Sequence, residues 1–239
     1  MRLALLSDQH ANDVAFRAAL QDVGRLDVDE VICLGDVAQG GVQPAETLDR
    51  LASLGCETVL GNADALLLEV PTDSPEPVTE RLLEVREWTL SQLGASQLEQ
   101  IRSFAPVVRR EVDGLSLLFF HGSPRSYDDV LLPEPDGEAL GPFVGHDAAL
   151  LAGGHTHLQW TRRLDGGLYV NPGSVGISVD RHREPATLRA LAEWALVTVA
   201  GEVVAVEFRQ VPYSAESART ATRQSGRPHA DEWAAQWSG

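Results

Sequence analysis

The sequence of 239 residues contains no lysine, so all 19 of its basic residues are arginine. This absence excludes a Schiff-base lysine and the Gly-Lys-Ser/Thr phosphate loop as the basis of catalysis. Positive charge is scarce in general, because 35 acidic residues give a net charge of −16. Non-specific nucleic-acid binding needs clustered cations, so we expect no general nucleic-acid partner. An anionic substrate therefore requires a local positive site.

Long apolar runs and cysteines are also few. No stretch approaches the roughly 18 uninterrupted apolar residues of a membrane-spanning helix, and the apolar start reaches Asp8 too early for a signal peptide. We therefore expect a cytoplasmic protein that does not bind membranes. Cys33 and Cys56, the two cysteines, lie in apolar runs that predict adjacent strands. We interpret them as reduced residues of the core.

The hydrophobic content of 44% is enough to close a large core, and the length favours one elaborated domain over residues 1–239. Helices are expected from the Asn12 cap onward, near Ala45–Leu54, at Glu80–Leu93 and Ser96–Phe104, and in a polar tail from Ser214. Val70–Pro77 predicts a loop. Strands are expected at Arg2–Ser7, Glu30–Leu34, Glu57–Leu60, Val107–Val112, Leu115–Phe120, Ala148–Ala152, Gln159–Leu164, Leu168–Val170, Trp194–Val199 and Val203–Val211.

Strands alternate with helices in the first part of the chain, and hairpins follow later. This order predicts an α/β fold, a sandwich of two mixed sheets with helices outside. Each cluster of polar, ligand-type residues follows a predicted strand. Because sites of α/β sheets are built at strand ends, we expect the clusters to meet at one edge.

Taken singly, these clusters are ambiguous. Asp8-Gln9-His10 could be a capped turn with a surface histidine, and both Asp36 and Asn62 could be ordinary turn residues. His155-Thr156-His157 is more specific, because two histidines two residues apart after a strand project to a common side. Histidine is scarce, and four of the seven lie at strand ends, the fourth being His121. Together the clusters predict a metal site.

Seven residues form two sets of four ligands if Asp36 is shared. The first set is Asp8, His10, Asp36 and His157, and the second is Asp36, Asn62, His121 and His155. Imidazole and oxygen ligands together favour transition metals over magnesium or calcium. Two divalent ions outweigh the two aspartates even with a bridging hydroxide, and thus supply the missing positive site. Such a pair, typically ~3.5–4 Å apart, generates hydroxide near neutral pH for in-line attack at phosphorus.

These motifs resemble the calcineurin-like metallophosphoesterases. The family pattern reads here, in order, as Asp8-Gln9-His10, Gly35-Asp36, Gly61-Asn62-Ala63-Asp64, His121-Gly122 and Gly154-His155-Thr156-His157. The similarity covers residues 1 to about 175. Further blocks, Asp8-x-His10-x-Asn12, His121 to Arg125 and Asn171 to Ser174, resemble the small bacterial and archaeal phosphodiesterase branch. The resemblance implies a four-layer α/β/β/α sandwich with the metal site at the strand ends. The metal-site motifs then lie within residues 1–175, and residues 190–239 add C-terminal strands and a helix.

The sequence departs from the family at position 63. The family's usual histidine there contacts the substrate phosphate and helps to protonate the leaving oxygen, whereas this chain has Ala63. Asp64, which holds that histidine in the family, then lacks its partner. Two other residues are predicted to bind substrate: Asn12, which could instead only cap its helix, and Arg125, for which a surface salt bridge is the alternative.

The function predicted from the sequence is a dinuclear metal-dependent phosphoesterase, a hydrolase of phosphodiesters or activated phosphate esters. The predicted catalytic residues are Asp8, Asp36, Asn62 and His155. Two divalent transition-metal ions are the expected cofactors, manganese first, with iron, zinc, nickel or cobalt as alternatives. A small phosphate ester or nucleotide is the expected substrate, and homo-oligomerisation is left open. The competing hypothesis is a metal-dependent binding or scaffold protein without catalysis.

Overall fold

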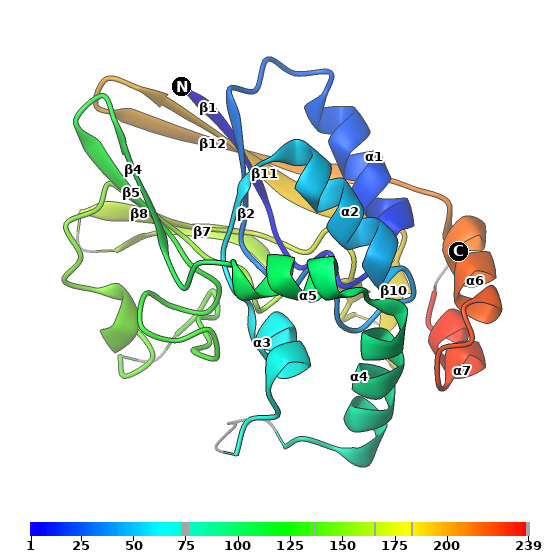
Figure 1. Cartoon of the computed structure of the whole chain (residues 1–239). Helices are drawn as coiled ribbons and strands as arrows, with labels where there is room; N and C mark the ends of the chain where they lie inside the picture. The colour runs from blue at the N-terminus through cyan, green and yellow to red at the C-terminus, as the bar shows by residue number, and fades with distance from the viewer. Residues whose placement is uncertain (73–76, 136, 165, 183, 238–239) are drawn as a thin grey trace.

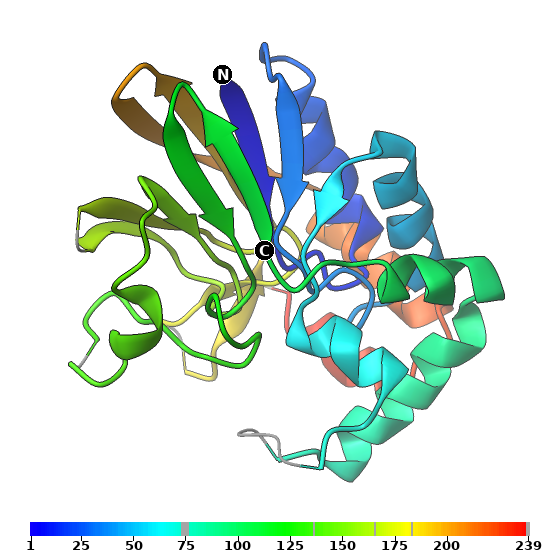
Figure 2. The same cartoon turned by 60° about the vertical axis from the view of Figure 1, so that its left-hand side comes forward.

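Two five-stranded mixed sheets face each other in the computed structural model, as Figures 1 and 2 show. The structure describes residues 1–72, 77–135, 137–164, 166–182 and 184–237. The predicted sandwich of two mixed sheets with helices is confirmed. None of the described helices combines the length and the apolar character needed to cross a bilayer.

The first sheet has the order β12-β11-β1-β2-β3. Its strands are β1 (Arg2–Leu6), β2 (Glu30–Cys33), β3 (Glu57–Thr58), β11 (Leu191–Ala200) and β12 (Val203–Pro212). β1, β2 and β3 are parallel, while β11 and β12 run antiparallel and bring the C-terminal part of the chain beside β1. Successive side chains alternate between faces, so Leu3 and Leu5 pack between the sheets while Ala4 and Leu6 pack under helices.

Helices cover the outer face of the first sheet. They are α1 (Asp13–Val23), α2 (Pro44–Leu54) and α5 (Ala95–Arg102), with α3 (Asn62–Leu68) and α4 (Glu80–Gln92) beyond the strand ends (Figure 1). Phe16 of α1, Leu48 of α2 and Ile101 of α5 are fully buried in the core on this face. Trp194 of β11 packs into the same cluster. The predicted helices at 80–93 and 96–104 are confirmed with shorter C-terminal ends.

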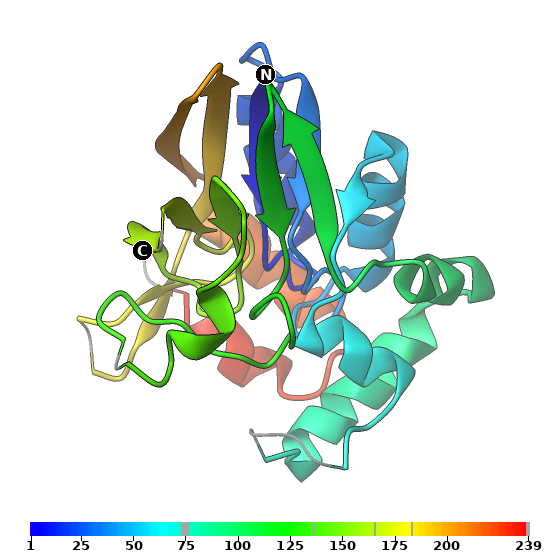
Figure 3. The same ribbon diagram turned by 90° about the vertical axis from the view of Figure 1, so that its left-hand side faces the viewer.

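The second sheet has the order β4-β5-β6-β8-β7. Its strands are β4 (Val108–Val112), β5 (Leu115–Phe119), β6 (Leu150–Ala152), β7 (Gln159–Leu164) and β8 (Gly167–Pro172). Figure 3 shows the β4–β5 hairpin, green, in front of β1 and β2, blue. Leu117, Phe119, Leu150 and Val170 fill the space between the two sheets.

The outer face of the second sheet is covered by the connection between β5 and β6. Leu131 and Phe143 of this connection pack on Phe120, Trp160 and Tyr169. Its one helical turn in the described residues is the 3₁₀ helix η1 (Gly141–Phe143). Prolines recur in the segment and prevent a long helix. The four layers thus keep the predicted order, but the fourth is an irregular segment instead of long helices.

The C-terminal part adds elements that the sequence pattern did not predict. These are the ribbon of β9 (Ser178–Asp180) and β10 (Thr187–Arg189) and a second helix, α7 (Ala230–Ala235), after α6 (Ala215–Gln224). Leu188, Ala218 and Trp237 are buried together and join these pieces. The predicted helix from Ser214 is confirmed as α6. It starts there because the Ser214 hydroxyl caps it by accepting from Ser217 N.

One expectation before the site needs revision, and another lies partly outside the described residues. The strand predicted at Glu57–Leu60 ends at Thr58, and helix α3 starts directly after it at Asn62. The Asp64 carboxylate accepts from Gly61 N at 3.4 Å, which stabilises the helix start. Part of the loop predicted at Val70–Pro77 lies outside the described residues.

Candidate metal centre

The seven predicted ligands all follow strands, and both sheets contribute. Asp8 and His10 follow β1, Asp36 follows β2, Asn62 opens α3 after β3, His121 follows β5, and His155 and His157 follow β6. Because the two sheets are stacked with these strand ends at the same edge, the side chains converge there. Two compact groups result among the described residues, one of Asp8, His10 and His157 and one of Asp36, His121 and His155.

The side chains of the first group lie within 4 Å of one another. Nε2 of His157 lies 3.2 Å from Oδ1 of Asp8 and 3.0 Å from Nε2 of His10. Nε2 of His10 lies 3.8 Å from the same Asp8 oxygen. That oxygen is buried and has no hydrogen-bond partner of good geometry among the described residues. A buried carboxylate oxygen facing two imidazole nitrogens fits a cation.

The second group meets the first at Asp36. Oδ2 of Asp36 lies 3.3 Å from Nε2 of His121 and 3.6 Å from Nε2 of His10, so one carboxylate oxygen faces both groups. The other oxygen, Oδ1, accepts from Ala63 N at 2.8 Å, which fixes the carboxylate. Oδ1 of Asn62 lies 3.0 Å from Nε2 of His121. These groups bring together the residues that the sequence assigned to each ligand set, and their role as ligands stays a prediction.

Backbone carbonyls orient three of the imidazole rings. Each ring places Nδ1 at a main-chain oxygen and turns Nε2 toward the centre. The pairs are His10 with Gln39 O at 2.8 Å, His121 with Leu34 O at 2.7 Å and His157 with Ile177 O at 3.1 Å. An Nδ1–H donated to a carbonyl fixes the tautomer and increases the basicity of Nε2, as in metal-ligating histidines.

Burial and charge act in opposite directions on these groups. Burial raises the pKa of Asp8 and of Asp36, but the neighbouring charges of His157 and His121 respectively leave each pKa below its usual range. Burial lowers the pKa of His121, but the carboxylates of Asp36 and Asp8 and the Leu34 carbonyl together outweigh it and raise that pKa to about 10. The buried carboxylates therefore require positive charge, which imidazole protons or bound cations can supply.

The ligand residues adopt unusual backbone conformations. Five have positive φ angles, a region that non-glycine residues rarely occupy. They are Asp8 (56°), His10 (45°), Asp36 (57°), His155 (68°) and His157 (54°). Each costs on the order of 1–3 kcal/mol, and such strain clusters at functional sites because the surrounding structure must impose it. The strain therefore indicates that the surrounding structure holds these side chains in place, and that the polar loops do not lie near one another by chance.

Two glycines permit the close packing of the loops. A Cβ at Gly154 would collide with Oγ of Ser7 and lie 2.6 Å from Oδ2 of Asp8. A Cβ at Gly61 would collide with Oδ1 of Asp36. Both positions bring main chain directly against a ligand carboxylate, which only glycine allows.

Asn171 and Ser174 support the site from behind, as expected for a structural turn. Nδ2 of Asn171 donates to Gly154 O at 2.6 Å and to Oγ1 of Thr156 at 3.1 Å. The Ser174 hydroxyl donates to Asp8 O at 2.9 Å. These bonds tie the turn after β8 to the loops that carry the ligands of the first group.

Comparison with known proteins agrees with this geometry. The sequence profile described as the calcineurin-like phosphoesterase superfamily domain matches residues 1–193. The chain belongs to this superfamily. A curated relative, the uncharacterized protein MJ0912 of Methanocaldococcus jannaschii, is 24% identical over 181 residues, which are 75% of this chain and 72% of the relative.

Solved structures of similar size share the fold. A metallophosphoesterase from Sphaerobacter thermophilus is 26% identical, with a TM-score of 0.77 over 99% of this chain and 97% of its own. The hypothetical protein PH1004 from Pyrococcus horikoshii is 19% identical, with a TM-score of 0.80 over 98% of this chain and 96% of its own. Both matches extend past the superfamily profile into the C-terminal helices.

The two residues that the sequence predicts to bind substrate are engaged in protein contacts. Oδ1 of Asn12 caps α1 by accepting from Ala15 N at 3.1 Å, and its Nδ2 donates to Gly176 O and to the Tyr213 hydroxyl. The structure thus shows the capping alternative, and a phosphate contact by Asn12 stays a prediction. Arg125 is exposed and donates from Nε to Oδ2 of Asp129 at 2.9 Å, the surface salt bridge that was the alternative reading. Its contact with phosphate also stays a prediction.

Asp64 has a structural role that sequence reasoning missed. Its fully buried carboxylate accepts from Val37 N at 2.9 Å and from Ala38 N at 3.3 Å, besides Gly61 N. Burial first, and the Asp36 charge second, raise its pKa to about 7. Asp64 therefore is not left without partners by Ala63, because it holds the loop that follows Asp36. The acidic residue directly after a Gly-Asn-x start of a helix was the signal available in the sequence.

Proposed function

We propose that this phosphoesterase uses two divalent metal ions to hydrolyse phosphodiesters or activated phosphate esters. The observation that supports it most is the position of Asp36, whose Oδ2 faces imidazoles of both ligand groups. A shared carboxylate is what a pair of closely spaced cations requires. The seven proposed ligands are Asp8, His10, Asp36, Asn62, His121, His155 and His157.

The ligands themselves favour transition metals. Imidazole nitrogens mixed with carboxylate and amide oxygens suit manganese, our first choice, and also iron, zinc, nickel or cobalt. Two such ions would supply a nucleophile at neutral pH and compensate charge on the phosphoryl oxygens. In a chain with a net charge of −16 and no lysine, this is the local positive site that an anionic substrate needs.

The protein side chains hold this site rigid. The Nδ1–H groups of His10 and His121 are bound to backbone carbonyls, so their rings cannot turn away from the centre. The Asp36 carboxylate is fixed by Ala63 N. Side chains that are already fixed around the reacting group do not have to reorganise during the reaction. This preorganisation is a main source of rate enhancement in enzymes.

The side chain at position 63 limits the substrates. Alanine cannot donate a proton to a leaving oxygen, and a positioned general acid contributes typically about 10²–10⁴-fold. We infer that preferred substrates are small esters or nucleotides whose leaving group is weakly basic, such as aryl oxides. The same residue is the reason to keep a non-catalytic, metal-dependent binding protein as the competing hypothesis.

The deciding experiment is hydrolysis of bis(p-nitrophenyl) phosphate by the purified protein with manganese, with metal analysis of the same sample. We expect turnover with about two ions per chain, and loss of both in Asp36→Ala. A protein that binds two ions but hydrolyses neither this diester nor p-nitrophenyl phosphate with any of the five metals would favour the scaffold hypothesis.

A further inference from the structure

A cavity of about 200 Å³ lies beside the second ligand group. Asn62 and His155, both proposed ligands, form part of its wall, and Ala63 lines it as well. The remaining walls come from α3, the start of α4 and the loop after β5, elements that Figure 1 shows beyond the strand ends. The cavity therefore opens directly onto the proposed metal centre.

Gln39 at this cavity is a buried amide with no hydrogen-bond partner among the described residues. Its side chain borders the cavity, and the residue is only 2% exposed. Neither Oε1 nor Nε2 makes a hydrogen bond with the part of the chain that the structure describes. A buried amide left unpaired costs roughly 1–3 kcal/mol, so native proteins normally satisfy it with protein, water or ligand.

The main chain of Gln39 is fixed by the metal centre itself. Its carbonyl accepts from Nδ1 of His10 at 2.8 Å, so the residue cannot move without disturbing a proposed ligand. The two neighbouring glycines, Gly40 and Gly41, pack against His10 and its main chain. The backbone of Gln39 is thus held at a fixed position between His10 and the cavity that the residue lines.

The cavity walls are mainly apolar, and their charged residues are acidic. Ala65, Leu66, Val78, Leu82 and Val130 are among the apolar lining residues, joined by the ring of Tyr127. The charged side chains in the described lining are Glu69 and Asp128, besides His155, and none is an arginine. Away from the proposed ions, a second anionic group would meet the carboxylates of Glu69 and Asp128 and no arginine of the described lining, which is unfavourable.

We propose that this cavity binds the organic group of the phosphate ester, an apolar group that is neutral or cationic, and that the Gln39 carboxamide donates a hydrogen bond to an ester oxygen. This inference rests on the proposed phosphoesterase function and adds the substrate class. An apolar cavity of about 150 Å³ holds one benzene molecule, so the space here suits a single substituted ring. Substrates with a second phosphate or a carboxylate on that group are excluded.

The test compares Gln39→Leu with Gln100→Leu in manganese-loaded protein, using calorimetric binding of phenylphosphonate, which cannot be hydrolysed. Loss of a hydrogen bond to a charged ligand weakens binding about 10- to 100-fold, and we expect this in Gln39→Leu. The same variant keeps two ions and an equal or higher melting temperature, because it removes an unpaired buried amide. Gln100→Leu binds phenylphosphonate normally and melts earlier, because Nε2 of Gln100 donates to Leu48 O at 3.1 Å.

A second arm tests the sign of the cavity charge. Wild-type protein should bind phenylphosphonate at least about tenfold more tightly than phosphonoacetate, and Leu82→Arg should reduce or reverse this preference, since an arginine supplies the missing cation. Equal affinity for the two phosphonates in wild type would overturn the substrate class. Unchanged phenylphosphonate affinity in Gln39→Leu, or a loss of ions and melting temperature together, would overturn the role of Gln39.

These binding measurements separate the two proposals. Phenylphosphonate binding that depends on Gln39 in a protein without hydrolysis would leave the pocket standing and refute the phosphoesterase function. Hydrolysis whose rate is unchanged by Gln39→Leu and by Leu82→Arg would support the phosphoesterase function and refute the proposed role of the pocket.

Discussion

Replacement of Asp36 by asparagine tests the shared carboxylate most directly. Asparagine keeps the shape of the side chain and an oxygen that can accept from Ala63 N, which Oδ1 of Asp36 does at 2.8 Å. It removes the negative charge that Oδ2 directs at both His10 and His121, 3.6 and 3.3 Å away. Both ion sites should therefore weaken together, whereas loss of an unshared ligand would weaken one.

The magnitude follows from linkage between binding and folding. An ion at one hundred times its dissociation constant stabilises the native state by about 2.7 kcal/mol, so two ions give about 5 kcal/mol. In a chain of this size each kcal/mol raises the melting temperature by roughly 2–4 °C, so saturating manganese should raise it by roughly 10–20 °C. For Asp36→Asn we expect a rise below about 5 °C and fewer than one ion per chain.

The assay is thermal melting with EDTA or with manganese, together with metal counting after desalting. Asp64→Asn is the matched control, because Asp64 is equally buried and close to Asp36, but its carboxylate accepts from the backbone amides of Val37 and Ala38. We expect Asp64→Asn to melt earlier in EDTA yet to keep two ions and the full manganese-induced rise. A full rise in Asp36→Asn would refute the shared carboxylate.

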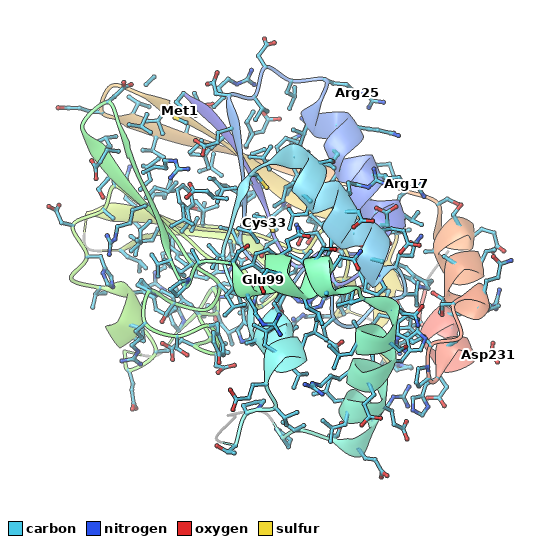
Figure 4. The ribbon with its side chains drawn as sticks, viewed as in Figure 1. Met1, Arg17, Arg25, Cys33, Glu99 and Asp231 are labelled. Carbon is cyan, nitrogen blue, oxygen red and sulfur yellow. The ribbon has the colours of Figure 1, made fainter. Side chains whose placement is uncertain are left out.

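Further predictions concern single ligands, the missing acid and the thiols. His121→Ala should deplete mainly the second ion and His10→Ala mainly the first; equal loss of both ions in each variant, by metal counting, would show that the sites are not separable. Ala63→His should raise the ratio of kcat/KM for an alkyl over an aryl phosphate ester; an unchanged ratio with both ions bound would mean that the new imidazole donates no proton to the leaving group. Cys33, labelled in Figure 4, is buried, and burial raises its pKa. It should therefore resist a thiol reagent that reaches the partly exposed Cys56, and both should react in denaturant. Reaction of both thiols at one rate in native protein would contradict the burial.

Much of the local structure was readable from the residues. The strand at the N-terminus ends before Asp8 because the apolar run ends there, and Gly35 and Gly61 mark the turns that carry Asp36 and Asn62. The helix α3 was missed because the Gly-Asn pair reads equally well as a turn. Only the contacts of Asp64 with the loop after Asp36 show why a helix starts at that point.

For two residues the sequence left two possible roles open, and only the fold shows which contacts they make. Asn12 in a loop before a helix is compatible with a cap or with a phosphate ligand, and the choice depends on whether Gly176 O and Tyr213 occupy its amide. Arg125 likewise finds Asp129 four residues later. Polar side chains such as these form hydrogen bonds with the groups that the tertiary structure brings near them. The residues adjacent in the sequence do not show which groups those are.

The sequence by itself determined the kind of ligand atoms, their places after strands and the family pattern, because strand ends and turns depend on local composition. Tertiary structure alone decided that Oδ2 of Asp36 faces both histidine groups and that five candidate ligand residues take positive φ angles. It also left the Gln39 amide beside a mainly apolar cavity with no partner among the described residues. These properties depend on how two sheets stack and bring loops together that are far apart in the chain. Burial and strain arise from that stacking, and no single segment carries them.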